Sequence, residues 1–271
     1  MTKLAFMTSV CPDWDLDRIF DAMERYGYDA LEPRIGWPNQ AGFQPEMPAE
    51  QRKEIRARFE KAGKSICCIA TGCKFAVPDT DERNQHVDDT LAAIDLAADL
   101  GAPFVRTFGG AHGGGEMNAN VNRAAETYRR VLDRAKEKNI VLLLETHDSW
   151  CSSSLVRAVV ERVNSPNLRV LWDIMHPQRM FERPEETMQI LGGLTRHLHA
   201  HDGNFPDPEG PITNTPLGEG AIDHATPMSL LKKSGYDGFV SVEVIHKPGS
   251  DHDPEPVLRQ YAEVLKKYVS A

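Results

Sequence analysis

The stretch IVLLLETHDSWCSSSLVRAVVERVNSPNLRVLWD, residues 140–173, contains two short apolar runs, and each run ends in a carboxylate. Glu145 ends the first run and Asp173 ends the second, 28 residues later. The pattern continues, since His199 stands in the next such run, 26 residues on, and Glu243 follows FVSV another 44 residues on. Each separation is about the length of one strand–helix unit, the last enlarged by a loop. The spacing predicts successive parallel strands with polar residues at their ends.

Eight short β-like runs alternate along the chain with longer segments of helical periodicity, a pattern typical of repeated βαβ units. The runs are KLAFMT, DALEPR, SICCIAT, PFVRTF, IVLLLE, LRVLWD, RHLHAHD and FVSVEVI. Helices are predicted near residues 15–25, 49–62, 81–100, 121–138 and 254–269, and the first and third end at glycines, Gly27 and Gly101.

Eight parallel strands close a barrel whose interior is filled by side chains. We therefore predict an α/β fold, a single (β/α)8 TIM-barrel domain over residues 1–271. The alternative is an open doubly wound sheet, but no G-x-G-x-x-G follows the first run.

Composition and charge limit the kinds of molecule that the protein is expected to bind. The net charge of −9 disfavours nucleic acid, whose affinity for proteins comes mostly from Lys and Arg on phosphates. No stretch approaches the roughly 20 apolar residues of a membrane helix, and the N-terminus lacks the long apolar region of a secretory signal. We expect a cytoplasmic protein with a small neutral, polyhydroxy substrate.

The chain has five cysteines, an odd number in a large protein. They are expected to be reduced, because disulfide frameworks belong mainly to small secreted domains. Cys68 and Cys73 form a C-x4-C without a second cluster, which is not a zinc signature.

A parallel barrel brings the ends of all its strands to one face, so Glu145, Asp173, His199 and Glu243 can converge there. Three carboxylates and one imidazole suit Mn²⁺, which we favour, or Mg²⁺ or Co²⁺, with Zn²⁺ also possible. Two neighbouring substrate oxygens could take the open positions, so that the cation stabilises an enediolate while carboxylates move the proton. Any one of the four could instead cap a helix or form an ion pair.

The segments LLLETHDSW, VLWDIMHP, RHLHAHDGN followed by PLGEGAID, and VSVEVIHKP resemble those of the xylose-isomerase-like sugar isomerase/epimerase family. AFMTS and GYDALEPR extend the resemblance over essentially the whole chain. It implies a TIM barrel, a divalent metal on the four residues named above, and Glu145 and Glu243 as the acid–base pair. His176 resembles the family histidine that hydrogen-bonds a substrate oxygen, although it could simply begin a helix ahead of Pro177. The family also makes a homo-oligomer plausible.

Other polar residues occupy apolar surroundings. Glu32, Arg34 and Arg106 either form an interior ion pair or bind substrate hydroxyls or a carboxylate. His147, two residues beyond Glu145, could bind substrate, bind a second metal ion, or hydrogen-bond to a ligand of the first metal ion.

Three histidines alternate in the seventh run and therefore share a face of the strand. His197 is expected deeper in the barrel interior, hydrogen-bonded there. His201 lies nearer the mouth, where it could touch substrate, and Asp202 completes the H-x-x-D turn of the resembled family.

Long loops are predicted at residues 35–48, 109–118 and 203–222, over the active face of the barrel. Within the second, GGAHGGG lacks the G-x-x-x-x-G-K-[ST] pattern of a phosphate cradle and is better explained as a mobile lid carrying His112. Trp37, Trp150 and Trp172 could line a sugar pocket, but large aromatics more often pack in the core.

These features favour a metal-dependent isomerase or epimerase, and a lyase of the same superfamily would share its enediolate. An abasic-site endonuclease of the same fold needs further histidines from early strands, and none precedes His86. A barrel without catalysis is disfavoured, because three clustered carboxylates repel one another unless a cation is present.

Overall fold

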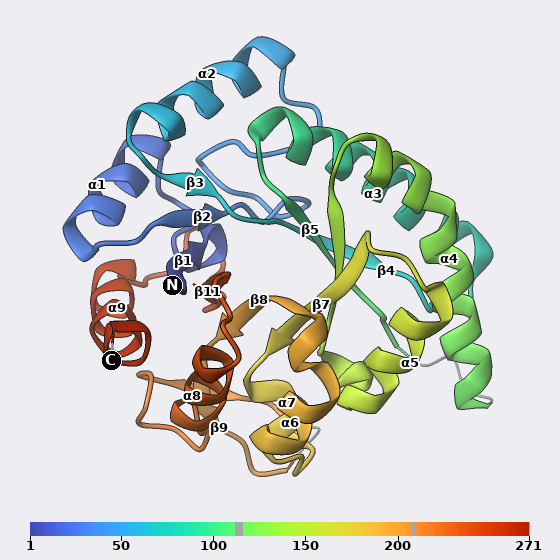
Figure 1. The fold of residues 1–271 in the computed structure, drawn as a ribbon. Coiled ribbons are helices and arrows are strands. Elements are labelled where there is room, and N and C mark those ends of the chain that lie inside the picture. The colour runs from blue at the N-terminus through green and yellow to red at the C-terminus, as the bar shows by residue number, and fades with distance from the viewer. Residues whose placement is uncertain (112–115, 208–209, 271) are drawn as a thin grey trace.

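The computed structural model describes residues 1–111, 116–207 and 210–270. Within them a parallel sheet of nine strands curls into a barrel in the order β3-β2-β1-β11-β8-β7-β6-β5-β4, with helices on its outside (Figure 1). Its strands are β1 Lys3–Met7, β2 Ala30–Glu32, β3 Ser65–Ile66, β4 Ile69–Lys74, β5 Phe104–Phe108, β6 Val141–Glu145, β7 Leu168–Asp173, β8 Thr195–Ala200 and β11 Phe239–Val242. The helices are α1 Leu16–Tyr26, α2 Ala49–Lys61, α3 Thr80–Leu100, α4 Met117–Glu137, α5 Ser153–Val163, α6 Met175–Arg179, α7 Pro184–Leu191, α8 Ala225–Lys233 and α9 Pro254–Ser270.

The predicted TIM barrel is confirmed, with one correction to the third strand. SICCIAT was expected to be continuous, but it forms two pieces, β3 and β4. Pro33 on the neighbouring strand path has no N–H, so the hydrogen-bond ladder is interrupted beside this strand. The barrel still closes there, because Cys67 donates to Leu31, and Arg34 forms a parallel bridge with Ala70.

Local sequence signals explain the helix ends. The Asp15 side chain accepts the N–H of Arg18 at the start of α1, and Gly27 ends that helix at a φ of 71°. α4 begins at Met117, four residues before the predicted start at Val121. For helices α5 to α8, the apolar periodicity of the sequence did not predict where each helix begins and ends.

The two faces of the sheet bury different side chains. Small and aliphatic residues fill the barrel interior, among them Ala5, Ala30, Cys68 and Leu171. A much larger apolar cluster fills the layer between the sheet and the helices. All five cysteines are buried and free, as expected of reduced thiols.

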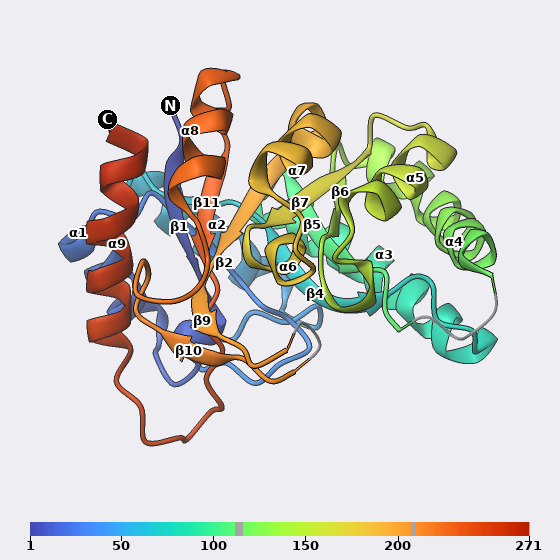
Figure 2. The ribbon, with the colours of Figure 1, turned by 90° about the horizontal axis from the view of Figure 1, so that it is seen from below.

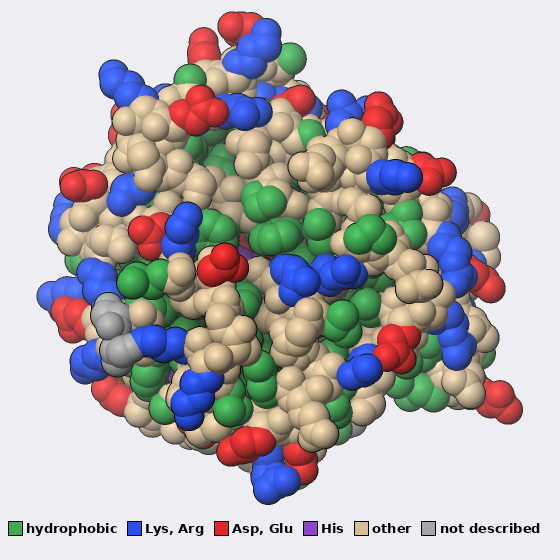
Figure 3. Space-filling model, in the orientation of Figure 1, with side chains coloured by type: hydrophobic (Ala, Val, Ile, Leu, Met, Phe, Trp, Pro, Cys, Tyr) green, Lys and Arg blue, Asp and Glu red, His purple; other side chains and the backbone are tan. Residues whose placement is uncertain are grey.

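Loops gather at the end of the barrel opposite the chain termini (Figure 2). The long loop after β8 is not irregular throughout, since β9 Asp202–Asn204 and β10 Thr213–Thr215 pair antiparallel within it. On the face in Figure 3, acidic and basic side chains are interspersed around the edge, and hydrophobic ones lie nearer the centre. Among the described residues, no helix is both long and apolar enough to span a membrane.

Candidate metal centre

Glu145, Asp173, His199 and Glu243 converge at the mouth of the barrel. Each offers one ligand atom, and these atoms all lie within 4.8 Å of one another. Two ligands on opposite sides of an ion, with bonds of about 2.1 Å, are roughly 4.2 Å apart. All four residues are buried, with Glu243 the most exposed at 4%. The arrangement is therefore nearly that of a coordination sphere.

The two glutamates stand at opposite ends of this group. Strands β6, β7, β8 and β11 are consecutive neighbours in the sheet. Glu145 ends β6 and Glu243 follows β11, with Asp173 and His199 on the strands between them. Both glutamates approach the same atom, His199 Nδ1, Glu145 Oε1 at 3.1 Å and Glu243 Oε2 at 2.9 Å. The two carboxylates therefore meet at His199 from the two outer strands of the group.

Arg106, from β5, pairs with Glu145. Its Nη1 lies 2.8 Å from Glu145 Oε2, and the two side chains are 1% and 0% exposed. Burial opposes ionisation of Glu145, but the charges of Arg106 and His199 outweigh it and lower the pKa of the carboxyl. Burial likewise opposes ionisation of Glu243, whose pKa is held well below its usual value by His199. Both carboxyls are thus anionic at neutral pH.

Glu32, from β2, lies beneath the four residues and contacts two histidines. Its Oε2 is 2.8 Å from His197 Nε2, and its two oxygens are each 3.1 Å from His199 Nε2. Burial disfavours the protonated form of His199, but Glu32, Glu243 and Glu145 raise its pKa well above the ordinary value.

An interior ion pair among Glu32, Arg34 and Arg106 was one expectation, and the structure assigns the partners differently. Arg106 binds Glu145, and Glu32 binds the histidines. Arg34 instead stacks over the ring of Trp37 at 4.5 Å. His197 lies fully buried in the barrel interior with Glu32 as its partner, where it was expected.

Two more histidines lie beside Asp173, and a third packs on one of them. His201 Nε2 is 2.8 Å from Asp173 Oδ2, and His176 Nε2 is 3.8 Å from the same oxygen. His147 packs against His176 with ring centroids 4.3 Å apart, and its Nδ1 is 2.9 Å from Asp148 Oδ1. Burial lowers the pKa of His176 well below its ordinary value, so this imidazole is neutral. His176 is also the second residue of α6, directly before Pro177, as the helix-start alternative expected.

The residues fit a divalent cation. Four buried carboxylates, those of Glu32, Glu145, Asp173 and Glu243, lie together with Arg106 and the imidazoles of His197, His199 and His201, and of these imidazoles only that of His199 belongs to the set of four. Clustered buried anions need positive charge, and an oxygen-rich set with one imidazole is the donor chemistry of Mn²⁺, Mg²⁺ and Co²⁺, with Zn²⁺ also accommodated.

Asp202 has a structural role that the sequence analysis did not identify. Its carboxylate accepts the backbone N–H groups of Gly203, Gly218, Gly220 and Ile222, from both ends of the loop after β8. A Cβ at Gly220 would lie 2.2 Å from Asp202 Oδ1. The glycines of PLGEGAID were the available signal, because backbone that approaches a carboxylate this closely leaves no room for a side chain.

The tryptophans are mainly packing residues. Trp150 and Trp172 are 0% and 1% exposed in the layer outside the sheet, whereas Trp37 is partly exposed beside Arg34. Trp150 donates from Nε1 to the carbonyl of Gly110 at 2.7 Å. The proposed lid residue His112 lies outside the described residues, as do residues 113–115.

We expect Gly109→Ala to destabilise the protein. A Cβ at Gly109 would lie 2.3 Å from the Trp150 indole, so the ring or the strand end must shift, at a cost of about 1–3 kcal/mol. Gly193→Ala is the control, because its Cβ would meet nothing within 4 Å. Urea unfolding of both variants checks this, and equal stabilities would contradict it.

Comparison with known proteins agrees with the fold. The chain is similar to the L-ribulose-5-phosphate 3-epimerase UlaE of Shigella flexneri, at 22% identity over 238 residues, which cover 85% of this chain and 82% of that protein. Among solved structures, the IolI protein with a bound zinc atom superposes with a TM-score of 0.84 at 19% identity, covering 99% of this chain and 98% of that one.

A dehydratase structure has the same fold. The probable 3-DHS dehydratase AsbF of Bacillus anthracis superposes with a TM-score of 0.79 at 17% identity, covering 98% of this chain and 99% of that one. The family model described as the xylose isomerase-like TIM barrel matches residues 20–268. The chain belongs to the xylose isomerase-like TIM barrel family.

Proposed function

We propose that this protein is a divalent-metal-dependent isomerase or epimerase of a ketose or a related polyhydroxy carbonyl compound. The observation that carries the proposal is the pair Glu145 and Glu243, both ionised, both in contact with His199 Nδ1, and carried by the two outer strands of the four that form the site. Inverting a carbon next to a carbonyl requires a proton to leave one face and return to the other. Similarity to a sugar-phosphate epimerase supports this assignment.

The four mouth residues Glu145, Asp173, His199 and Glu243 would hold the cation, with Mn²⁺ favoured. When bound, it would polarise the carbonyl and its neighbouring hydroxyl and so lower the energy of an enediolate. One glutamate takes the proton from the carbon between those oxygens, and the other returns a proton to the opposite face. Arg106 fixes Glu145 in position, and Glu32 orients the His199 ring from below.

His176, His201 and His147 would bind the substrate beside Asp173. The neutral imidazole of His176 can donate one hydrogen bond to a substrate oxygen and accept another. The loop tied down by Asp202 covers the same end of the barrel, which restricts water access during proton transfer.

A lyase is the second candidate. It would remove the same proton but expel a hydroxyl from the adjacent carbon, with a group such as His201 or His147 protonating the leaving oxygen. Because the protein shares its fold with a probable dehydratase, the test also measures loss of water.

The test measures two reactions in deuterated solvent. Protein stripped with a chelator and reloaded with Mn²⁺ is incubated with simple ketoses, L-ribulose 5-phosphate, an inosose and dehydroshikimate. Exchange of the α-hydrogen with formation of an epimer or isomer supports the first candidate, and loss of water supports the lyase. We expect the stripped protein to be at least about 100-fold less active. Equal activity with and without the cation would refute metal dependence.

A further inference from the structure

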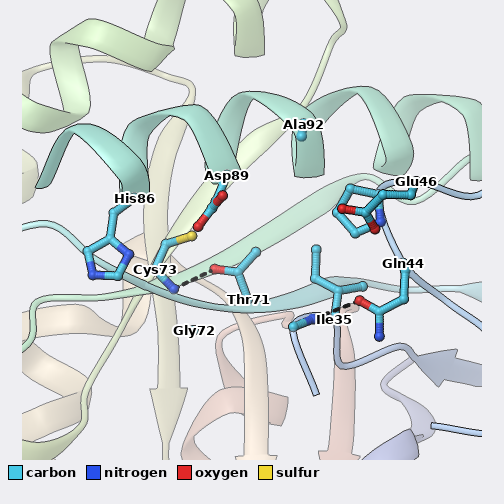
Figure 4. A pocket seen from close by; sticks show the side chains of 11 residues that line it. Ile35, Gln44, Glu46, Thr71, Gly72, Cys73, His86, Asp89 and Ala92 are labelled. Atoms are coloured by element: carbon cyan, nitrogen blue, oxygen red, sulfur yellow. Dashed lines mark hydrogen bonds between the residues drawn. The ribbon is translucent and has the colours of Figure 1, made fainter. Parts of the chain in front are cut away.

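A second cluster of metal-ligating side chains lies outside the barrel, in a cavity of about 330 Å³ between α3, β4 and the loop after β2 (Figure 4). Cys73 reaches it from β4, and His86 and Asp89 reach it from α3. Cys73 packs with the apolar cluster between the sheet and the helices, whereas Cys68 on the same strand path belongs to the barrel interior. The cavity is therefore on the opposite face of the sheet from Glu145.

The sulfur, the imidazole and the carboxylate are close enough to share one ion. One ligand atom from each of Cys73, His86 and Asp89 lies within 4.8 Å of the others. His86 and Asp89 are three residues apart on α3, so both project from the same side of the helix toward β4. Cys73 is 4% exposed, and the His86 side chain is 17% exposed. The sulfur is therefore buried and the imidazole largely so, whereas Asp89 is exposed at the surface.

Neighbouring residues contact two of the ligands. Gln85 Nε2 donates to Asp89 Oδ1 at 2.8 Å, which leaves the second carboxylate oxygen for an ion. Glu82 Oε1 lies 3.4 Å from His86 Nε2, within ion-pair distance, but the ring nitrogen makes no hydrogen bond with any described residue. Such outer contacts are a regular feature of metal sites.

We propose that Cys73, His86 and Asp89 form a second metal site, selective for a thiophilic transition metal such as Zn²⁺. A thiolate, an imidazole and a carboxylate are all zinc ligands, and three protein ligands leave a fourth position open. The cavity supplies the space for a water or small ligand there. The bound ion would join β4 to α3.

Sulfur ligation gives the site its own spectroscopic signature. Metal-free protein is titrated with Co²⁺, and the near-ultraviolet sulfur-to-cobalt charge-transfer band is followed. The four residues at the barrel mouth include no sulfur, so the band reports the second site whether or not the mouth binds an ion. We expect the band to appear in the wild type and to disappear in Cys73→Ser, with one ion fewer bound per chain.

Two further cysteines provide matched controls. Cys67 lies near Glu32 and His197, and Cys151 Sγ is 3.7 Å from His176 Nδ1. Cys67→Ser and Cys151→Ser are expected to keep the band. A band that survives in Cys73→Ser, or that never forms at saturating Co²⁺, would overturn the proposal.

The helix ligands give a test that does not disturb the buried strand. Asp89 is exposed, so Asp89→Asn should leave the fold intact. We expect its affinity for Co²⁺, measured from the charge-transfer band, to be lower by at least about tenfold. Asp88→Asn, its exposed neighbour on α3, should leave the affinity unchanged. Equal affinities in the two variants would also refute the site.

Discussion

Replacing Glu243 with glutamine is expected to lower turnover by about 100- to 10,000-fold, the usual contribution of a positioned general acid or base. The amide keeps the shape of the side chain but cannot accept a proton from carbon. It is also a weaker ligand, so the variant loses charge from the set that would hold the cation.

The measurement has to separate these two losses. Turnover and α-hydrogen exchange are followed at saturating Mn²⁺, and bound metal is determined on the same sample. Glu219→Gln is the matched control, because Glu219 is an exposed carboxylate in the loop after β8. We expect it to be as active as the wild type. A metal-loaded Glu243→Gln within tenfold of wild-type activity would show that Glu243 is not part of the acid–base pair.

Replacing Arg106 with methionine is expected to cost about 3–5 kcal/mol in the free energy of unfolding, measured without added metal. Methionine retains most of the side-chain length, but it leaves Glu145 buried at 0% exposure without the cation that now lies 2.8 Å away. His199 Nδ1, 3.1 Å from Glu145 Oε1, then remains its partner, but a buried carboxylate that loses its cation costs far more than a lost surface pair.

A surface pair provides the comparison. Arg157 Nε lies 2.7 Å from Glu161 Oε1, but these side chains are 46% and 59% exposed. Arg157→Met should therefore change the free energy by no more than about 0.5 kcal/mol. The double variant Arg106→Met/Glu145→Gln should recover part of the loss, since the orphaned charge is gone. Urea unfolding in the presence of chelator measures the free energy of unfolding of all three variants. If Arg106→Met matches Arg157→Met, the buried pair does not stabilise the fold.

The barrel could be predicted from sequence because its signals are local. Each strand is a short apolar run, each helix has its own periodicity, and glycines such as Gly27 mark the ends. The positions of Glu145, Asp173, His199 and Glu243 follow from the same logic, since a residue at a strand end reaches the same face in every β/α unit.

Contacts between distant elements could not be predicted in this way. The sequence left Glu32, Arg34 and Arg106 as either an interior ion pair or substrate contacts, because which acid meets which base depends on the stagger of the strands around the barrel. That stagger pairs Arg106 with Glu145 and Glu32 with His197 and His199. Similarly, Cys73 had no motif to connect it with His86 and Asp89, because the helix must first dock on the sheet.

The sequence by itself determined that eight apolar runs alternate with helices and that polar residues stand at the ends of four of them, since both properties are periodic and local. Only the tertiary structure decided which side chains meet, which face inward, and how Asp202 ties the loop after β8 together. The physical reason is that these contacts depend on the radius and closure of the barrel, which no short segment encodes by itself.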